Sequence, residues 1–190
     1  MTAGFRRQSE RSLHRWHVWD LIEGSYESPT GEEFVRTFVR SPGAVSVVAV
    51  DETVTPPTVI LIRQWRAAME REMWEVPAGM RDKEGEDPAT TARRELLEEV
   101  GYTVDSMELL ANFHPSVGIT DGSHLIYLAR GLTHVGAQTE GPEEQHLVIE
   151  QVPFDQALTM VWHGTITASS AVIGLLMAAA RLGIPTLPTP

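Results

Sequence analysis

The middle of the chain is a series of short apolar runs that predict β-strands. Residues 44–50 (AVSVVAV) and 58–65 (TVILIRQW) are rich in β-branched side chains and are separated by DETVTPP, a proline-containing turn. Residues 73–79 (MWEVPAG) predict a third strand, which Pro77 and Gly79 end. Further strands are expected at 107–113, 124–132 and 146–154.

Helical patterns alternate with these strands. The stretch EDPATTARRELLEEVGY predicts the best-defined helix, with Asp87 as its N-cap, Pro88 in the first turn and Gly101 just past its end. Two more helices and a tail are expected at 154–164, 167–183 and 186–190. Strands that alternate with a few helices predict an α/β (α+β) sandwich.

The first 40 residues differ from this pattern, because they are polar and carry Trp16, Trp19 and a turn signal, SPTG. We expect residues 1–40 to form a small N-terminal β arm and residues 41–185 to form the main domain. An arm of this size has little core of its own. Its expected role is therefore to join two copies in a homodimer.

Composition and charge narrow the range of functions. The chain has 15 Lys and Arg against 26 Asp and Glu, a formal net charge of −11, which disfavours binding to nucleic acid or to anionic membranes. Without cysteine, disulfides and thiolate sites are excluded. No run approaches the roughly eighteen apolar residues of a membrane span, and the first residues lack an apolar signal segment. We expect a cytoplasmic protein that acts on small molecules.

The best-defined helix places three acidic side chains on one arc. At about 100° per residue, Glu99, Glu95 and Glu98 lie at roughly −60°, −100° and −160° from Leu96. Leu96 belongs to a narrow stripe of residues that are expected to be buried: Ala89, Ala92, Leu96 and Val100. The acids therefore lie beside the buried stripe.

Two interpretations of this acidic cluster are open. The first is a solvated face relieved by Arg93 and Arg94. However, the i,i+4 attraction between Arg94 and Glu98 is worth only a few tenths of a kcal/mol, and the Glu95–Glu99 repulsion opposes it by a similar amount. The second is a divalent cation site, because Mg²⁺ and Mn²⁺ prefer carboxylate oxygens. The sequence favours Mg²⁺, with Mn²⁺ as a possible substitute.

The same stretch resembles a known family signature. G-x6-E-x7-RELLEEVGY, from Gly79 through Glu86 to Tyr102, is similar to the Nudix hydrolase signature G-x5-E-x7-R-E-U-x-E-E-x-G-U, in which U is aliphatic. There are two departures: an extra residue between Gly79 and Glu86, and Tyr102 at the final aliphatic position. The helical carboxylates keep their register, so the resemblance implies a Nudix-type α/β/α sandwich with a mixed sheet.

A wider resemblance runs from about Arg36 to Ala179. Pro115 and the stretches LIRQWR, WEVPAGM and FHPSVGITDGSHLIYLA are similar to those of bacterial ADP-ribose pyrophosphatases. The resemblance implies Mg²⁺-dependent hydrolysis of the diphosphate of ADP-ribose or a related nucleoside diphosphate sugar. The products would be a nucleoside monophosphate and a sugar phosphate.

The resemblance also implies site residues. The metal would be bound by the backbone carbonyl of Ala78 and the carboxylates of Glu95 and Glu99, with Glu98 assisting. Substrate-binding candidates are Arg66, Arg36, Trp16 and Met80. Arg66 matches an arginine that clamps the diphosphate, although a surface ion pair is an alternative role. Arg36 and Arg40 are weaker candidates for the same work, and Trp16 and Trp19 either stack on a nucleobase or pack in a core or interface.

The sequence offers more than one candidate for the base that activates water. Relatives commonly carry a glutamate after S-x-G-x-[ST]-D, but this chain reads SVGITDG, with Gly122 at that position. The candidates are Glu98 and the pair Glu143 and Glu144, whereas Asp121 is expected to be dispensable. The nearby histidines, His114 and His124, are expected to be exposed or hydrogen-bonded and not metal ligands.

Two further functions stay open beside ADP-ribose hydrolysis. One is the same chemistry on GDP-mannose, another nucleotide sugar or a damaged nucleoside triphosphate. The other is a catalytically weak sensor that binds ADP-ribose, which Gly122 favours. The intact acidic cluster and the lack of an appended DNA-binding domain oppose the sensor.

Overall fold

The computed structural model describes residues 4–137 and 146–186, which divide into two compact units. Unit 1 comprises the chain up to Gly43 together with residues 113–123, and unit 2 comprises residues 44–112 and the chain from His124 onward. Within the described ranges, no helix is long and apolar enough to cross a membrane. The sequence predicted an arm of residues 1–40 alone, whereas unit 1 also includes residues 113–123.

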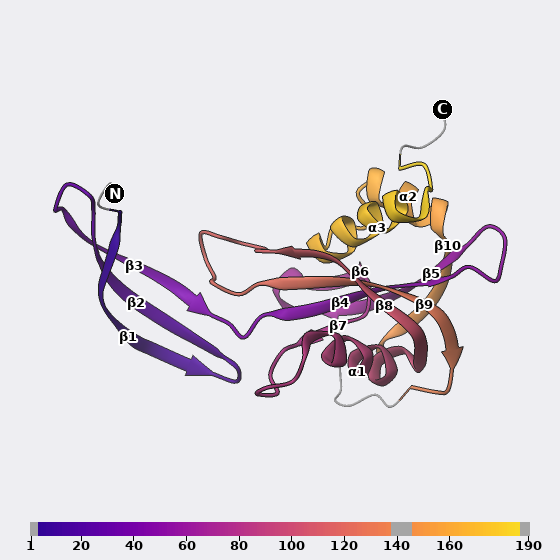
Figure 1. The fold of residues 1–190 in the computed structure, drawn as a ribbon, viewed down its shortest axis with the longest axis horizontal. Helices are drawn as coiled ribbons and strands as arrows, with labels where there is room; N and C mark the ends of the chain where they lie inside the picture. The colour runs from indigo at the N-terminus through magenta and orange to yellow at the C-terminus, as the bar shows by residue number, and fades with distance from the viewer. Residues whose placement is uncertain (1–3, 138–145, 187–190) are drawn as a thin grey trace. The chain divides into compact units, whose positions relative to one another are not determined.

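Unit 1 is built on an antiparallel sheet with the strand order β1-β2-β3. The strands are β1 (Arg6–Trp16), β2 (Trp19–Glu27) and β3 (Glu33–Arg40), drawn in indigo and purple in Figure 1. Residues 119–121 extend this unit, because the Val39 N–H donates to Ile119 O at 2.7 Å and Val39 O accepts from the Asp121 N–H at 3.3 Å. Every residue of β1 is exposed.

Unit 2 contains a mixed sheet with the strand order β10-β5-β4-β9-β8. Its strands are β4 (Ala44–Asp51), β5 (Thr58–Arg66), β8 (Tyr102–Phe113), β9 (His124–His134) and β10 (Val148–Pro153). β4 runs parallel to β9, whereas β5 pairs in antiparallel register with both β4 and β10. The mixed sheet confirms this part of the expected fold class.

Helices cover both faces of this sheet (Figure 1). On one face α1 (Pro88–Val100) buries Leu96 in the same apolar cluster as Val47 of β4. On the other face lies α3 (Ser169–Leu182), where a side chain at Gly174 would crowd Val48. Val47 and Val48 point to opposite faces because side chains alternate along a strand. With α2 (Phe154–Trp162) in the α3 layer, unit 2 is the expected α/β/α sandwich.

The local sequence sets both ends of α1. The Asp87 carboxylate accepts hydrogen bonds from the N–H groups of Ala89 and Thr90 at 3.0 and 3.3 Å, and Pro88 is the first residue. Gly101 ends the helix in the left-handed conformation, with φ of 74°, which suits glycine. The expected bounds are confirmed. The buried stripe is present as well, although Ala89 is only partly buried.

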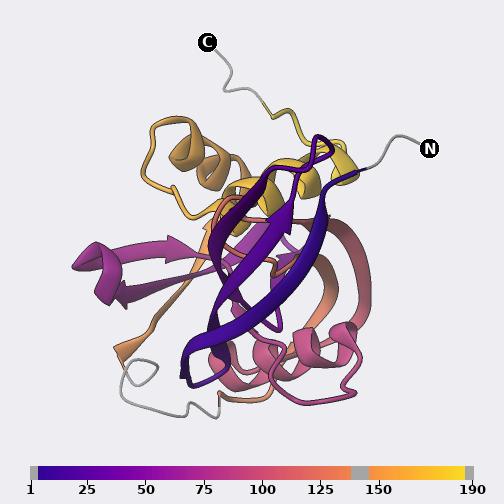
Figure 2. The same cartoon turned by 90° about the vertical axis from the view of Figure 1, so that its left-hand side faces the viewer.

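One strand prediction was wrong, because residues 73–79 do not form a single strand. β6 (Arg71–Glu75) pairs with β5, and β7 (Ala78–Met80) pairs with β4. Pro77 lies between them and has no N–H for a strand ladder, while its carbonyl accepts from the Val47 N–H at 2.9 Å. In Figure 2 the β5–β6 hairpin, with η1 (Ala67–Met69) at its tip, extends to the left. The break places β7 beside α1.

Candidate active site on helix α1

The three acidic side chains of α1 lie in different environments. Glu99 is buried, with 5% exposure, and its Oε2 accepts a hydrogen bond from the Ala78 N–H at 2.9 Å. The Glu95 carboxylate lies directly against Gly79, where an added Cβ would collide with it. Glu98 is more exposed than either. Glu95 and Glu99 therefore link α1 to β7.

Arg94 supplies the counter-charge of this cluster. Its Nη1 lies 2.7 Å from Glu95 Oε1 and 2.9 Å from Glu98 Oε2, and its Nη2 lies 3.3 Å from Glu86 Oε2. Burial disfavours the charged guanidinium, but the hydrogen bonds and charges of these three carboxylates outweigh that effect and raise the pKa of Arg94. The expected pair with Glu98 is present. The contacts with Glu86 and Glu95 were not anticipated.

Glu95 is poorly stabilised in its charged form. Burial raises its pKa, and the charge of Arg94 opposes that effect only in part. In contrast, a hydrogen bond from Thr91 Oγ1 at 2.8 Å lowers the pKa of Glu86. A bound cation would favour the ionised form of Glu95.

The fit to a metal ion depends on the donor set. Over residues 4–137 and 146–186, no three carboxylate or histidine side chains gather closely enough to enclose an ion. In α1 the carboxylates of Glu95 and Glu98 both contact the Arg94 guanidinium. The donors still suit a hard divalent cation, since they are carboxylate oxygens beside a backbone segment and include no sulfur. The metal-binding role of Ala78, Glu95, Glu98 and Glu99 stays a prediction.

Arg66, the expected diphosphate clamp, lies at the end of β5. Its Nε and Nη2 contact the two carboxylate oxygens of Glu75 at 2.7 and 2.8 Å. The alternative role as an ion pair is therefore observed, but the pair joins an exposed arginine to a buried carboxylate. Met80 lies on β7 opposite Ala44 of β4. The substrate-binding roles of Arg66 and Met80 stay predictions.

Two other substrate-binding candidates lie in unit 1. Arg36 stands over the Phe34 ring at 4.8 Å, and both side chains line a cleft of about 550 Å³ within this unit. The cleft also contains Phe5, Tyr26, Phe38 and Asp121. Trp16 is 38% exposed and stacks on His14 at a centroid distance of 5.7 Å. An aromatic cleft with an arginine suits a flat base, and the roles of Arg36 and Trp16 stay predictions.

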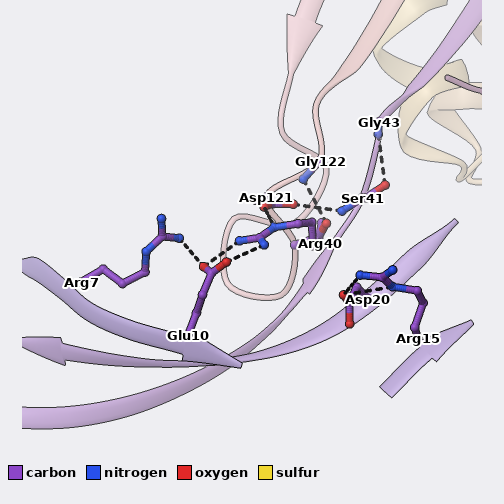
Figure 3. A network of polar contacts seen from close by, with 10 residues as sticks. Arg7, Glu10, Arg15, Asp20, Arg40, Ser41, Gly43, Asp121 and Gly122 are labelled. Atoms are coloured by element: carbon purple, nitrogen blue, oxygen red, sulfur yellow. Dashed lines mark hydrogen bonds and ion pairs between the residues drawn. The ribbon is translucent and has the colours of Figure 1, made fainter. Parts of the chain in front are cut away.

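Asp121 is part of a polar network in unit 1 (Figure 3). Its carboxylate accepts a hydrogen bond from the Ser41 N–H at 3.0 Å and lies 3.5 Å from Arg40 Nε. Arg40 also donates two hydrogen bonds to Glu10, at 2.8 and 2.9 Å, and these lower the pKa of Glu10. At Gly122 an added Cβ would lie 2.9 Å from Ser41 Cβ. A glutamate at position 122 would therefore require Ser41 to move.

We expect Asp121→Ala to lower kcat by less than about fivefold. Its contacts with Ser41 and Arg40 are structural, and hydrogen bonds of this kind contribute roughly 1 kcal/mol each to stability. Steady-state kinetics on a nucleotide sugar and urea unfolding would separate the two effects. An inactive variant that still binds Mn²⁺ would identify Asp121 as the base and contradict the assignment.

Both histidines near this loop are hydrogen-bonded. His114 Nδ1 lies 3.3 Å from Gly122 O, and His124 Nε2 lies 2.6 Å from the Oγ of buried Ser46. Burial lowers the pKa of His124 to about 4, from its usual 6.5. Neutral His124 therefore belongs to the folded state throughout the physiological pH range.

This shift has a consequence for acid stability. The folded chain binds the His124 proton more weakly than the unfolded chain. The contribution of neutral His124 to stability is therefore fully present above pH 6.5 and is lost as the pH drops towards about 4. The loss is at most about 3 kcal/mol, and smaller because solvent reaches part of the ring. Urea unfolding at pH 7 and pH 4 should show a smaller acid loss for His124→Gln than for the wild type. Equal losses would mean that other groups cause it.

Two candidate bases lie outside the described residues, and one residue near the site was not predicted from the sequence. Glu143 and Glu144, two of the candidate bases, lie outside the described residues, so Glu98 is the remaining candidate in the described part of the chain. Glu75 was not anticipated. Its signal was an acidic residue inside the otherwise apolar run MWEVPAG, since a buried acid in a strand needs a partner.

Comparison with known proteins places this chain in a family. The family model of the NUDIX domain matches residues 40–169. An ADP-ribose pyrophosphatase of Mycobacterium tuberculosis is 34% identical over 172 residues, which are 90% of this chain and 82% of that protein. A CMP-5'-(N-acetyl-N-hydroxy-3-aminopropyl)phosphonate hydrolase of Streptomyces rubellomurinus is 35% identical over 169 residues, 89% of this chain and 79% of that protein.

A solved structure supports the same fold. The crystal structure of an ADP compounds hydrolase superposes with a TM-score of 0.83 at 19% identity and covers 96% of each chain. At that identity the likeness concerns the fold. Together with the matches above, it confirms the Nudix resemblance, and the chain belongs to the NUDIX domain family.

Proposed function

We propose that this chain hydrolyses the diphosphate of ADP-ribose or a related nucleoside diphosphate sugar, giving a nucleoside monophosphate and a sugar phosphate. The observation that carries the proposal is the joint between α1 and β7. There, Glu99 accepts from the Ala78 N–H and Glu95 lies against Gly79, so the signature carboxylates are in direct contact with β7. The similarity to the Mycobacterium tuberculosis ADP-ribose pyrophosphatase supports the choice of substrate.

A divalent ion held by Glu95, Glu98, Glu99 and the Ala78 carbonyl would neutralise the diphosphate and lower the pKa of an attacking water. Arg66 would bind the phosphate oxygens through its planar guanidinium. Water adds its oxygen to one phosphorus, the bond from that phosphorus to the bridging oxygen breaks, and the bridging oxygen leaves with the other phosphate. Mg²⁺ as the ion and a cytoplasmic location are parts of the same proposal and rest on the sequence.

The proton of the attacking water would pass to Glu98 or to the Glu143 and Glu144 pair. Glu98 is the most exposed of the three α1 carboxylates, and its Oε2 contacts Arg94 Nη1 at 2.9 Å. A partly exposed carboxylate at the edge of the metal site can exchange its proton with solvent after each turnover. This supports Glu98 as the base.

A second candidate is hydrolysis of a different nucleotide conjugate. The Streptomyces rubellomurinus relative is as similar as the mycobacterial one, but its name describes a CMP-linked phosphonate. The two names share a nucleoside monophosphate joined to a second phosphorus group. The nucleobase and the leaving group are therefore the open part of the proposal.

The test is turnover of a panel of conjugates in Mg²⁺, with release of the nucleoside monophosphate measured by chromatography. ADP-ribose, GDP-mannose and a CMP-linked phosphonate should be included. We expect the highest kcat/KM for ADP-ribose. Tight ADP-ribose binding without turnover of any member would favour the sensor and contradict the enzyme assignment.

We also propose that unit 1 joins two copies in a homodimer. Phe5 and Val35 are 70% and 52% exposed, and β1 is exposed along its whole length, so the unit presents apolar and backbone surface that a second copy can cover. Light scattering of the full chain should give twice the mass of one copy. A mass of one copy at micromolar concentration would contradict the dimer.

A further inference from the structure

We propose that Glu75 is a positioning residue, which fixes the Arg66 guanidinium in the orientation that binds the substrate diphosphate. In the proposed function, on which this inference rests, Arg66 contacts the phosphate oxygens. Glu75 lies outside the family signature, which begins at Gly79. It is also not one of the carboxylates that face the expected metal.

The contact between the two side chains has the geometry of a fork. Arg66 Nε donates to Glu75 Oε1 at 2.7 Å and Arg66 Nη2 donates to Glu75 Oε2 at 2.8 Å. Two parallel hydrogen bonds fix the plane of the guanidinium, whereas a single bond would leave it free to rotate. The orientation of Arg66 is therefore set by Glu75.

Burial assigns different tasks to the two residues. The Glu75 side chain is 10% exposed and that of Arg66 is 41% exposed. A buried carboxylate cannot readily contact an incoming nucleotide, and it would repel a diphosphate if it did. Arg66 can reach the ligand. The arrangement is therefore an exposed binding group held by a buried support.

The strand register explains why Arg66 needs a support. Ile62 pairs with Glu75 and Arg66 pairs with Arg71, so Glu75 and Arg66 point to the same face of the hairpin. Arg66 is the last residue of β5, directly before η1. An arginine at a strand end has side-chain rotamer entropy to lose on binding. Holding it in place before the ligand arrives reduces that cost.

Glu75 also connects Arg66 to the signature carboxylates. It precedes Pro77 and Ala78 in one short segment, which Val47 holds through its N–H bond to Pro77 O at 2.9 Å. The Ala78 N–H then donates to Glu99. Three extended residues span roughly 10 Å, so this segment sets the spacing between the arginine and the metal-binding carboxylates. That spacing would suit a diphosphate bridging the two.

The same hairpin contains a matched control. Arg63 and Glu72 form an ion pair at 3.4 Å between β5 and β6, with side chains 37% and 50% exposed. Arg63 and Glu72 are each three positions from the proposed pair, so they point to the opposite face of the hairpin. Glu72→Gln therefore removes an ion pair of the same chemistry without touching Arg66.

The experiment measures binding of a non-hydrolysable ADP-ribose analogue, with a methylene in place of the bridging oxygen, by calorimetry in Mg²⁺. We expect Glu75→Gln to raise Kd about tenfold, because an NH2 donor replaces one of the two acceptor oxygens and the fork is lost. Arg66→Lys keeps the charge without the fork and should have a similar effect. The double variant should bind no more weakly than Arg66→Lys, and Glu72→Gln should stay within about twofold of the wild type.

Mn²⁺ binding without nucleotide distinguishes a loss of Arg66 orientation from a disrupted fold. The Mn²⁺ affinity should be unchanged in Glu75→Gln. Wild-type affinity in Glu75→Gln or Arg66→Lys, or additive losses in the double variant, would overturn the proposal. So would a wild-type protein that does not bind the analogue. If Glu75→Gln does not fold, Arg66→Lys alone decides. A wild type that binds the analogue but does not hydrolyse ADP-ribose refutes the proposed function and leaves the binding test valid.

Discussion

Glu99→Gln and Glu95→Gln should each abolish hydrolysis, with a fall in kcat of at least about a thousandfold, or roughly 4 kcal/mol of lost transition-state stabilisation. The reason is the loss of a charged ligand at the expected metal site. The fold should survive the first change, because the glutamine oxygen at position 99 can still accept from the Ala78 N–H. Kinetics in Mg²⁺ and Mn²⁺, with thermal unfolding, would test both points.

The matched control for these variants is Glu108→Gln. Glu108 lies in the same unit and pairs with Arg181 at 2.7 Å, but its side chain is 44% exposed. Surface pairs of this kind contribute at most about 1 kcal/mol to stability, so activity should stay near wild type. If Glu99→Gln and Glu95→Gln kept more than a tenth of the wild-type kcat, neither carboxylate would be an essential metal ligand.

Gly79→Ala is the second change with a large expected effect, a loss of kcat of about a hundredfold. The added methyl group would collide with the carboxylate of Glu95, so either Glu95 or the β7 backbone must move. Displacement of Glu95 removes one expected metal ligand, and displacement of β7 disturbs the Ala78 carbonyl. Activity and Mn²⁺ affinity should therefore fall together.

Gly118→Ala is the control for this substitution. No heavy atom lies within 4 Å of a Cβ built at Gly118, and its backbone does not require glycine. Because Gly118 lines the unit 1 cleft, the control is its Mn²⁺ affinity, which should match that of the wild type. A fully active Gly79→Ala variant would show that the position of Glu95 against Gly79 is not required for activity.

The parts of the fold that local chemistry determines could be predicted from the sequence. Asp87, Pro88 and Gly101 each act within a few residues of where they stand, and they set the ends of α1 as expected. The run 73–79 failed because its apolar pattern continues through Pro77. The pattern cannot show that the partner strand changes from β5 to β4 at that residue. β8 likewise begins at Tyr102, five residues before the strand expected at 107.

The candidate site also has features that the local sequence predicts and features that depend on tertiary packing. The arc of Glu95, Glu98 and Glu99 follows from helical periodicity, and it was found. The burial of Glu99 and the contact of Glu95 with Gly79 depend on the packing of α1 against β7, which no local pattern contains. The Arg66–Glu75 fork depends on strand register and was missed for the same reason.

The guanidinium of Arg94 gives the acidic helix a built-in substitute for a metal ion. Zinc fingers unfold when their ion is removed, because nothing else neutralises or ties their ligands. Here three carboxylates already have a positive partner from the same chain. A cation at the expected site would compete with that partner, so its binding would be an exchange with a modest net gain. Chelators should therefore inactivate this protein without unfolding it. Its activity would then depend reversibly on the concentration of divalent ions around it.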